Sequence, residues 1–153
     1  MKGSMTSRPI RLATRAIIVQ DNRLLLVNAF PGPESTLWCA PGGGAEPHAS
    51  LPDNLAREVH EETGLTIRVG PPALVNEFHN PDTGFHQVEV FFRCTVTGGA
   101  VCDAWTDPEG IVHRRRWFTR SEMAGIRFKP DSLPHVAWGR GCGYDPLERL
   151  VKA

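Results

Sequence analysis

Three glutamates lie close together in the run Arg57-Glu58-Val59-His60-Glu61-Glu62-Thr63-Gly64-Leu65. If this run is helical, Glu58, Glu61 and Glu62 are spaced i, i+3 and i+4 and share one face, where like charges repel by roughly 0.2–0.5 kcal/mol per pair. A divalent cation would offset that repulsion. Clustered carboxylate oxygens suit Mg²⁺ or Mn²⁺, which usually bind substrate phosphates as well. The run therefore predicts a site for Mg²⁺, with Mn²⁺ as the alternative ion.

The apolar residues of the same segment indicate that two of these acids point inward. An apolar stripe is formed by Leu51, Leu55 and Val59. At roughly 100° per residue, Glu62 falls inside this stripe and Glu58 lies on its flank. An ordinary solvated helix would carry its acids on the opposite side. We therefore predict a functional helix over residues 51–62, with Ser50 as its N-cap and Gly64 at its C-terminal end.

The spacing of these residues resembles the signature of a known family. Gly43 followed by Arg57-Glu58-Val59-x-Glu61-Glu62-x-Gly64-Leu65 is similar to the Nudix hydrolase signature GX5EX7REUXEEXGU, in which U is apolar. The flanks resemble that family as well, from residues 12–28 through Trp38-x-x-Pro41-Gly42-Gly43 to Trp117-Phe118. The resemblance implies an α+β fold, a Nudix-like α/β/α sandwich with a mixed β-sheet, in which the signature forms a loop-helix-loop.

The resemblance also implies an activity and a set of site residues. The activity is Mg²⁺-dependent cleavage of the pyrophosphate linkage of a nucleoside diphosphate joined to another group, as in an NTP, ADP-ribose or a nucleotide sugar. Glu58, Glu61 and Glu62 match the metal-binding and base-bearing positions, and the Gly43 carbonyl is a further ligand by resemblance. Glu58 is the first choice as general base, because crowded acids raise one another's pKa. Glu61 and Arg57 complete the catalytic set within the signature.

A downstream loop offers a further acid. Some members of the family use a carboxylate from such a loop, and Asp107 and Glu109 lie in one here. Glu109 is the better candidate for a catalytic role. A solvated loop acid is the alternative interpretation.

Ala49 departs from the signature, which has a glutamate six residues after the position of Gly43. In the family that glutamate mostly supports the loop and pairs with the signature arginine, here Arg57. We hypothesise that Asp53, one helical turn before Arg57, takes over as its partner, with Glu46 as the second candidate. The alternative is a weak or inactive Nudix-like module that binds or senses a nucleotide, for which Ala49 is the only support.

Substrate recognition is less clearly indicated. A strand over residues 111–118 would place Arg114 and Arg116 on one face, where guanidinium groups could bind phosphates. Glu46, in the glycine-rich turn, is a third candidate for substrate binding. A solvated or salt-bridged strand edge is the alternative for the arginines.

Composition limits the classes of partner. The 153 residues are 41% apolar and carry 17 basic and 17 acidic side chains, so no net charge favours nucleic acid or an anionic membrane. We expect a polar arm over residues 1–10, one domain over residues 11–153, and a nucleotide-like small molecule as the partner. The chain contains no run of 18 apolar residues, so no membrane-spanning segment is expected. Four cysteines without a CxxC pair indicate free thiols and a cytoplasmic protein, although two disulfides are possible by number. A homodimer through an edge strand is compatible with this pattern.

Apolar runs and turn residues predict the remaining elements. Strands are expected over residues 12–20, 23–28, 37–40, 66–69, 73–79 and 86–96. Asp21-Asn22 is a hairpin signal, and Pro71-Pro72 is expected to break the strand that contains it. Thr119-x-x-Glu122 is a capping box, and a short helix is expected over residues 132–139. The tail after Arg140 carries no clear pattern.

Overall fold

The computed structural model describes residues 8–151. The elements, in chain order, are β1 (Arg11–Gln20), β2 (Arg23–Asn28), β3 (Leu37–Cys39), β4 (Gly42–Gly44), α1 (Leu51–Thr63), β5 (Thr66–Asn80), β6 (Phe85–Gly98), β7 (Arg115–Thr119), the 3-10 helix η1 (Glu122–Gly125), β8 (Arg127–Phe128), α2 (Leu133–Ala137), β9 (Gly143–Tyr144) and β10 (Glu148–Arg149). Of the polar arm predicted over residues 1–10, residues 1–7 lie outside the described part of the chain.

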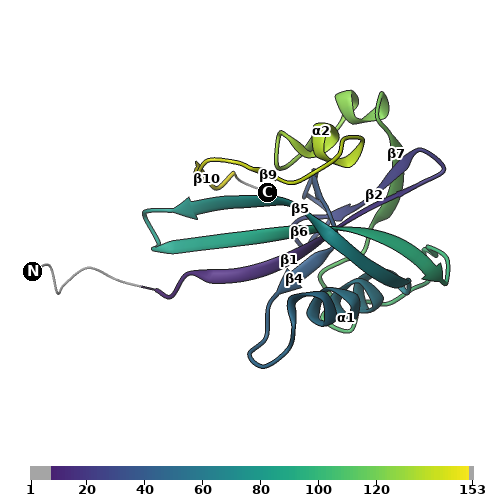
Figure 1. Ribbon diagram of the computed structural model, residues 1–153, viewed down its shortest axis with the longest axis horizontal. Helices are drawn as coiled ribbons and strands as arrows, with labels where there is room; N and C mark the ends of the chain where they lie inside the picture. Colours follow the sequence, from purple (N-terminus) through teal and green to yellow (C-terminus); the bar gives the residue numbers. More distant parts are fainter. Residues whose placement is uncertain (1–7, 152–153) are drawn as a thin grey trace, which may run out of the picture.

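The strands form one mixed sheet in the order β10-β5-β6-β1-β2-β3-β8, with β4 also on β1, β7 on β2 and β9 on β5. β1 is parallel to β6 over residues 11–18 and antiparallel to β2 and β4. Figure 1 shows β1 running along the long β5–β6 hairpin nearly to its tip, where Arg11 pairs with Gln87. The predicted mixed sheet is confirmed.

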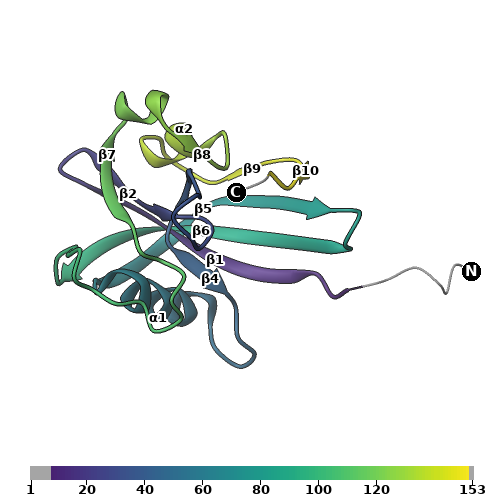
Figure 2. The ribbon, with the colours of Figure 1, turned by 180° about the vertical axis from the view of Figure 1, so that it is seen from behind.

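Helices cover the two faces of this sheet. Figures 1 and 2 show α1 on one side and α2 with η1 on the other. β1 supplies both cores because successive side chains of a strand point to opposite faces. Ile17 packs in the cluster with α2, whereas Ala16 and Ile18 pack in the cluster with Leu55 of α1. The α+β sandwich predicted from the sequence is confirmed.

Helix α1 begins and ends where its capping residues predict. The Ser50 side chain accepts a hydrogen bond from the Asp53 amide at 3.1 Å. At the other end Gly64 has φ 78°, a left-handed conformation that glycine adopts without strain, and its amide donates to the His60 carbonyl. The helix therefore runs one residue beyond the predicted 51–62.

Two short-range signals are confirmed. Asp21 and Asn22 have φ 52° and 62°, the positive values of a type I′ hairpin turn. Thr119 and Glu122 form the reciprocal capping box: the Thr119 amide donates to the Glu122 carboxylate at 2.7 Å, and the Glu122 amide donates to the Thr119 hydroxyl at 3.2 Å.

Three predicted boundaries are wrong. β5 continues through Pro71-Pro72, because register shifts on either side of Pro72 accommodate the prolines within the pairing to β6. β7 begins at Arg115 and not at residue 111, because the Asn28 Oδ1 atom accepts the amides of His113 and Arg114. The helix expected over residues 132–139 is the shorter α2.

No helix among residues 8–151 is long and apolar enough to cross a bilayer.

Candidate metal and phosphate site

The glycine-rich turn packs directly on the acidic helix. A Cβ atom at Gly43 would lie 2.2 Å from Glu58 Oε2, and one at Gly42 would lie 1.9 Å from the Thr14 carbonyl oxygen. Gly42 also has φ +153°, which side chains rarely adopt. The turn therefore requires glycine at position 42, whereas a side chain at position 43 would displace the Glu58 carboxylate from its place beside the turn.

Three carboxylates converge beside this turn. Ligand oxygens of Glu58, Glu61 and Glu109 all lie within 4.8 Å of one another, although Glu109 is distant in the sequence. Glu58 is buried, Glu61 is half-buried and Glu109 is exposed. Glu58 and Glu109 line a cleft of about 420 Å³, together with Gly43. Burial raises the pKa of Glu58, Arg57 opposes that rise, and Glu109 and Glu61 add to it.

Hydrogen bonds hold the loop that carries Glu109. Asp107 is buried, and its Oδ1 accepts the Glu109 amide at 3.0 Å while its Oδ2 accepts the amides of Ile111 and Val112 at 3.2 and 2.8 Å. Trp105, earlier in the same loop, donates from Nε1 to the Glu61 carbonyl at 2.8 Å. Hydrogen bonds thus join the loop internally and also connect it to α1. The sequence pattern favoured Glu109 over Asp107 for the site but gave no indication of this supporting role.

Replacing Asp107 tests that role. Asp107→Asn removes the charge and keeps one acceptor oxygen, but in either orientation it sets an NH₂ group against at least one backbone amide. Hydrogen bonds to charged groups contribute about 1.5–3 kcal/mol each, so we expect the free energy of unfolding to fall by about 2 kcal/mol. Denaturant unfolding measures this change. The control is Asp103→Asn, an exposed acid of the same loop, and equal stability of the two variants would contradict the assigned role.

Arg57 is held by acids and by a buried asparagine. Its guanidinium lies 3.1 Å from Glu61, 3.2 Å from Glu58 and 3.5 Å from the exposed Glu46. Within the described chain, Asp53 makes no ion pair with Arg57, so the hypothesis of compensation by Asp53 is wrong. The second candidate, Glu46, is in place but is too exposed to contribute much.

Asn54 performs the two tasks expected of the glutamate that Ala49 replaces. Its Oδ1 accepts from Arg57 Nη2 at 3.0 Å and from the Glu46 amide at 3.2 Å. Its Nδ2 donates to the Gly44 carbonyl at 3.1 Å. This buried amide therefore supports both the glycine-rich loop and the signature arginine. Sequence reasoning missed it, although its place three residues before Arg57 puts the two on one helical face.

Glu62 lies apart from the three clustered acids. Its carboxylate accepts the Gly42 amide at 3.1 Å and is 9% exposed. Burial raises the pKa of Glu62 to about 8, opposed first by Arg15 and then by the Gly42 amide. Glu62 thus holds the glycine-rich turn through the Gly42 amide. Its role as a metal ligand stays a prediction.

The raised pKa of Glu62 predicts a pH-dependent stability. Its ordinary pKa is 4.5, so between about pH 4.5 and 8 the folded protein binds more protons than the unfolded chain. The free energy of unfolding therefore falls as pH rises through that window. In metal-free denaturant titrations, the wild type should lose stability relative to Glu62→Gln between pH 5 and pH 8. Parallel pH profiles for the two proteins would contradict this.

The two arginines predicted to bind phosphate lie elsewhere. The Arg114 guanidinium packs 5.3 Å from the Trp38 ring and donates to the Ser35 carbonyl. Arg116 packs 5.5 Å from the Phe118 ring. Neither lines the carboxylate cleft. Asn28 displaces the start of β7, so the alternation expected of a strand from residue 111 does not apply to Arg114, and phosphate binding by the two arginines stays a prediction.

Arg15 is a site residue that sequence reasoning missed. It lies on β1, lines the carboxylate cleft, and its Nε is 2.7 Å from Glu89 Oε2. Its Nη1 donates to the carbonyls of Ala40 and Gly42 at 3.2 and 3.4 Å. A half-buried cation thus holds the backbone at the start of the glycine-rich turn. A lone arginine within an apolar strand was the available signal.

Comparison with known proteins identifies the family. A family model described as the NUDIX domain matches residues 9–139. The chain belongs to the Nudix family. Diphosphoinositol polyphosphate phosphohydrolase 2 from Rattus norvegicus is 35% identical over 99 residues, which are 65% of this chain and 51% of that protein. This Nudix chain thus spans about half the length of the curated relatives it matches.

Solved structures share the Nudix fold. A UDP-X diphosphatase matches with a TM-score of 0.70 and 20% identity, over 94% of this chain and 71% of the other. The mutator MutT protein from Bacillus halodurans matches with a TM-score of 0.71 and 23% identity, over 88% and 87%. At these identities the likeness concerns the fold alone.

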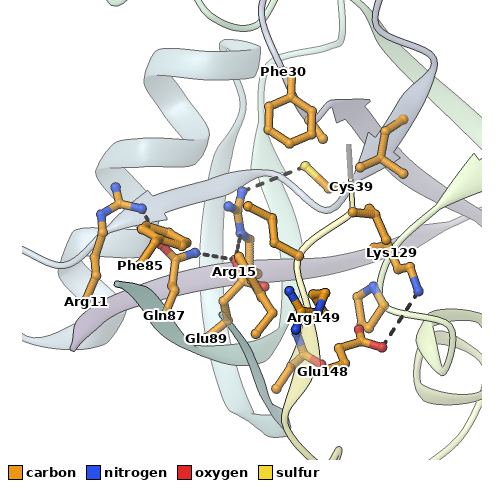
Figure 3. Close-up of a pocket in the computed structure, with 17 residues that line it drawn as sticks. Arg11, Arg15, Phe30, Cys39, Phe85, Gln87, Glu89, Lys129, Glu148 and Arg149 are labelled. Atoms are coloured by element: carbon orange, nitrogen blue, oxygen red, sulfur yellow. Dashed lines mark hydrogen bonds and ion pairs between the residues drawn. The ribbon is translucent and has the colours of Figure 1, made fainter. Parts of the chain in front are cut away.

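A second cavity adjoins the carboxylate cleft. It has a volume of about 240 Å³ and shares Arg11, Arg15 and Cys39 with the cleft. Figure 3 shows Arg15 inside it, joined to Glu89 and Cys39. Burial raises the pKa of the Cys39 thiol to about 12, and all four cysteines are free. One wall comes from Glu148 to Val151, beyond the matched Nudix segment.

Proposed function

We propose that this protein is a Mg²⁺-dependent hydrolase that cleaves the pyrophosphate linkage of a nucleoside diphosphate joined to another group. The observation that carries the proposal is the convergence of Glu58, Glu61 and Glu109 within 4.8 Å. Three acids brought so close carry more negative charge than Arg57 alone offsets, so a further cation between them would relieve their repulsion. Membership of the Nudix family supports the same reaction class.

The donor set fits a hard divalent cation. All three groups offer carboxylate oxygens, which Mg²⁺ and Mn²⁺ prefer. Glu109 is exposed, so the cluster is accessible from the cleft. The Gly43 carbonyl and Glu62 are the other proposed ligands. Bound there, the ion would neutralise phosphate charge and lower the pKa of a coordinated water.

The protein's own groups have separate tasks in this proposal. Glu58 accepts the proton of the attacking water, since its burial raises its affinity for a proton. Arg57 keeps the Glu58 and Glu61 carboxylates in place through its ion pairs with both. Glu109 closes the cluster from the loop that Asp107 holds.

A turnover screen tests the proposal. Purified protein is incubated with canonical and oxidised NTPs, ADP-ribose, nucleotide sugars, dinucleoside polyphosphates and diphosphoinositol polyphosphates, with Mg²⁺ or with EDTA. We expect hydrolysis of at least one nucleotide in Mg²⁺ and none in EDTA. Turnover that persists in EDTA would contradict the metal dependence. No turnover across the panel would favour a nucleotide sensor over an enzyme.

A further inference from the structure

The second cavity is too small for a whole nucleotide. Its volume is about 240 Å³, against roughly 300–1,000 Å³ for pockets that enclose drug-sized ligands. It meets the carboxylate cleft at Arg11 and Arg15, which line both. A substrate with its diphosphate in the cleft would therefore place only its adjoining part in this cavity.

An unpaired amide lines the cavity. Asn76 of β5 is 2% exposed, and within the described chain its buried Oδ1 has no hydrogen-bond partner. Gln87, which also lines the cavity, is already engaged, because it accepts from Arg11 and donates to Glu89 at 2.9 Å. A carboxamide carries a donor beside an acceptor, so Asn76 suits a ligand edge that presents the same pair.

Aromatic side chains supply apolar surface around this amide. Phe30, Phe78 and Phe85 line the cavity, and the rings of Phe78 and Phe85 lie 6.0 Å apart at 40°. Figure 3 shows Phe30 and Phe85 among the lining side chains. Flat apolar faces beside one unpaired polar edge match a planar heteroaromatic ring.

The charges of the cavity disfavour a polyphosphorylated ring. Arg15 is paired with Glu89 at 2.7 Å, and Lys129 lies 3.7 Å from Glu148. Both acids line the cavity, where they would repel phosphate groups. Arg11 is hydrogen-bonded to Gln87. Of the four lining cations, Arg15 and Lys129 are thus paired with acids, which leaves Arg11 and Arg149 without an ion pair among the described residues, whereas a phosphorylated inositol would need several such cations.

We propose that this cavity binds the nucleobase of the substrate and that Asn76 determines specificity by reading the hydrogen-bonding edge of the base. The inference rests on the proposed function and names the half of the substrate that is held away from the reacting phosphates.

The C-terminal tail completes the pocket. β10 pairs with β5 beside Phe78, and the Leu150 amide donates to the His79 carbonyl at 2.8 Å. Base selection therefore involves residues outside the family segment.

Ligand binding without metal or turnover tests this directly. Isothermal titration calorimetry compares AMP, GMP, CMP and UMP with ribose 5-phosphate, which has the sugar and phosphate but no base. At least one nucleotide should bind ten-fold tighter than ribose 5-phosphate, and Asn76→Leu should abolish that advantage. The variant should keep or gain stability, since the amide oxygen it removes is unpaired. Equal affinity of all five ligands, or an advantage that survives Asn76→Leu, overturns the proposal.

The tail is tested at Leu150. Leu150→Trp should fill the cavity and abolish the nucleotide advantage, whereas the control Leu150→Ala should retain it. Unchanged nucleotide affinity in Leu150→Trp overturns the place of the tail in the pocket. The failure of this proposal differs from that of the proposed function: turnover without base-dependent binding overturns the pocket alone, and base-dependent binding without turnover overturns the hydrolase alone.

Discussion

Glu58→Gln is expected to lower kcat by about 10²–10⁴-fold, the usual contribution of a general base. The substitution keeps the shape of the side chain but removes the charge that would hold the cation and accept the proton. It should leave the melting temperature unchanged or slightly raised without metal, because Glu58 is a buried acid close to Glu61 and Glu109. Steady-state turnover of the best substrate from the screen, and thermal unfolding with and without Mg²⁺, measure both effects.

The matched control lies on the same helix. Asp53 is exposed, and among residues 8–151 its side chain makes no ion pair, so Asp53→Asn should retain wild-type kcat. Mg²⁺ should raise the melting temperature of the wild type and of the control but not of Glu58→Gln, since a ligand stabilises only the state that binds it. Turnover in Glu58→Gln equal to that of the control would remove Glu58 from the base role.

Arg15→Met is expected to give the largest loss of stability. Removing one partner of a buried ion pair costs about 3–5 kcal/mol, because the other charge is left buried and unpaired. Here Glu89 is 5% exposed and Glu62 is 9% exposed, and both carboxylates face Arg15. At about 2–4 °C per kcal/mol the melting temperature should fall by roughly 6–20 °C. Differential scanning calorimetry measures the shift.

A double variant separates the ion pair from simple loss of packing. Arg15→Met with Glu89→Leu removes both charges and should recover part of the lost stability. If the double variant is less stable than Arg15→Met by the full cost of a second independent mutation, the two side chains do not interact as the geometry implies.

The signature helix could be predicted because its determinants are local. Ser50, Gly64 and the apolar stripe act within a few turns, and each is found where the pattern places it. The spacing of Glu58 and Glu61 likewise determines that they share a face. Periodicity and capping are properties of neighbouring residues, so one sequence is enough to read them.

The contacts that complete the site join distant parts of the chain. Asn28 ends the loop before β7 from 85 residues away, which moved Arg114 off the predicted strand. Arg15 and Glu89 meet because β1 lies parallel to β6, a pairing that no local pattern indicates. Asn54 replaces the missing glutamate through hydrogen bonds that depend on how the glycine-rich turn folds back.

The central claim is that Glu58, Glu61 and Glu109 hold a divalent cation. Anomalous diffraction from crystals soaked in Mn²⁺ tests it most directly, since Mn²⁺ has a strong anomalous signal and the carbon, nitrogen and oxygen atoms of the protein have almost none. The account predicts a peak bonded to carboxylate oxygens of Glu58 and Glu61, with Glu109 beside it, and no such peak in Glu58→Gln crystals. A peak at some other site, or none at saturating Mn²⁺, would contradict it.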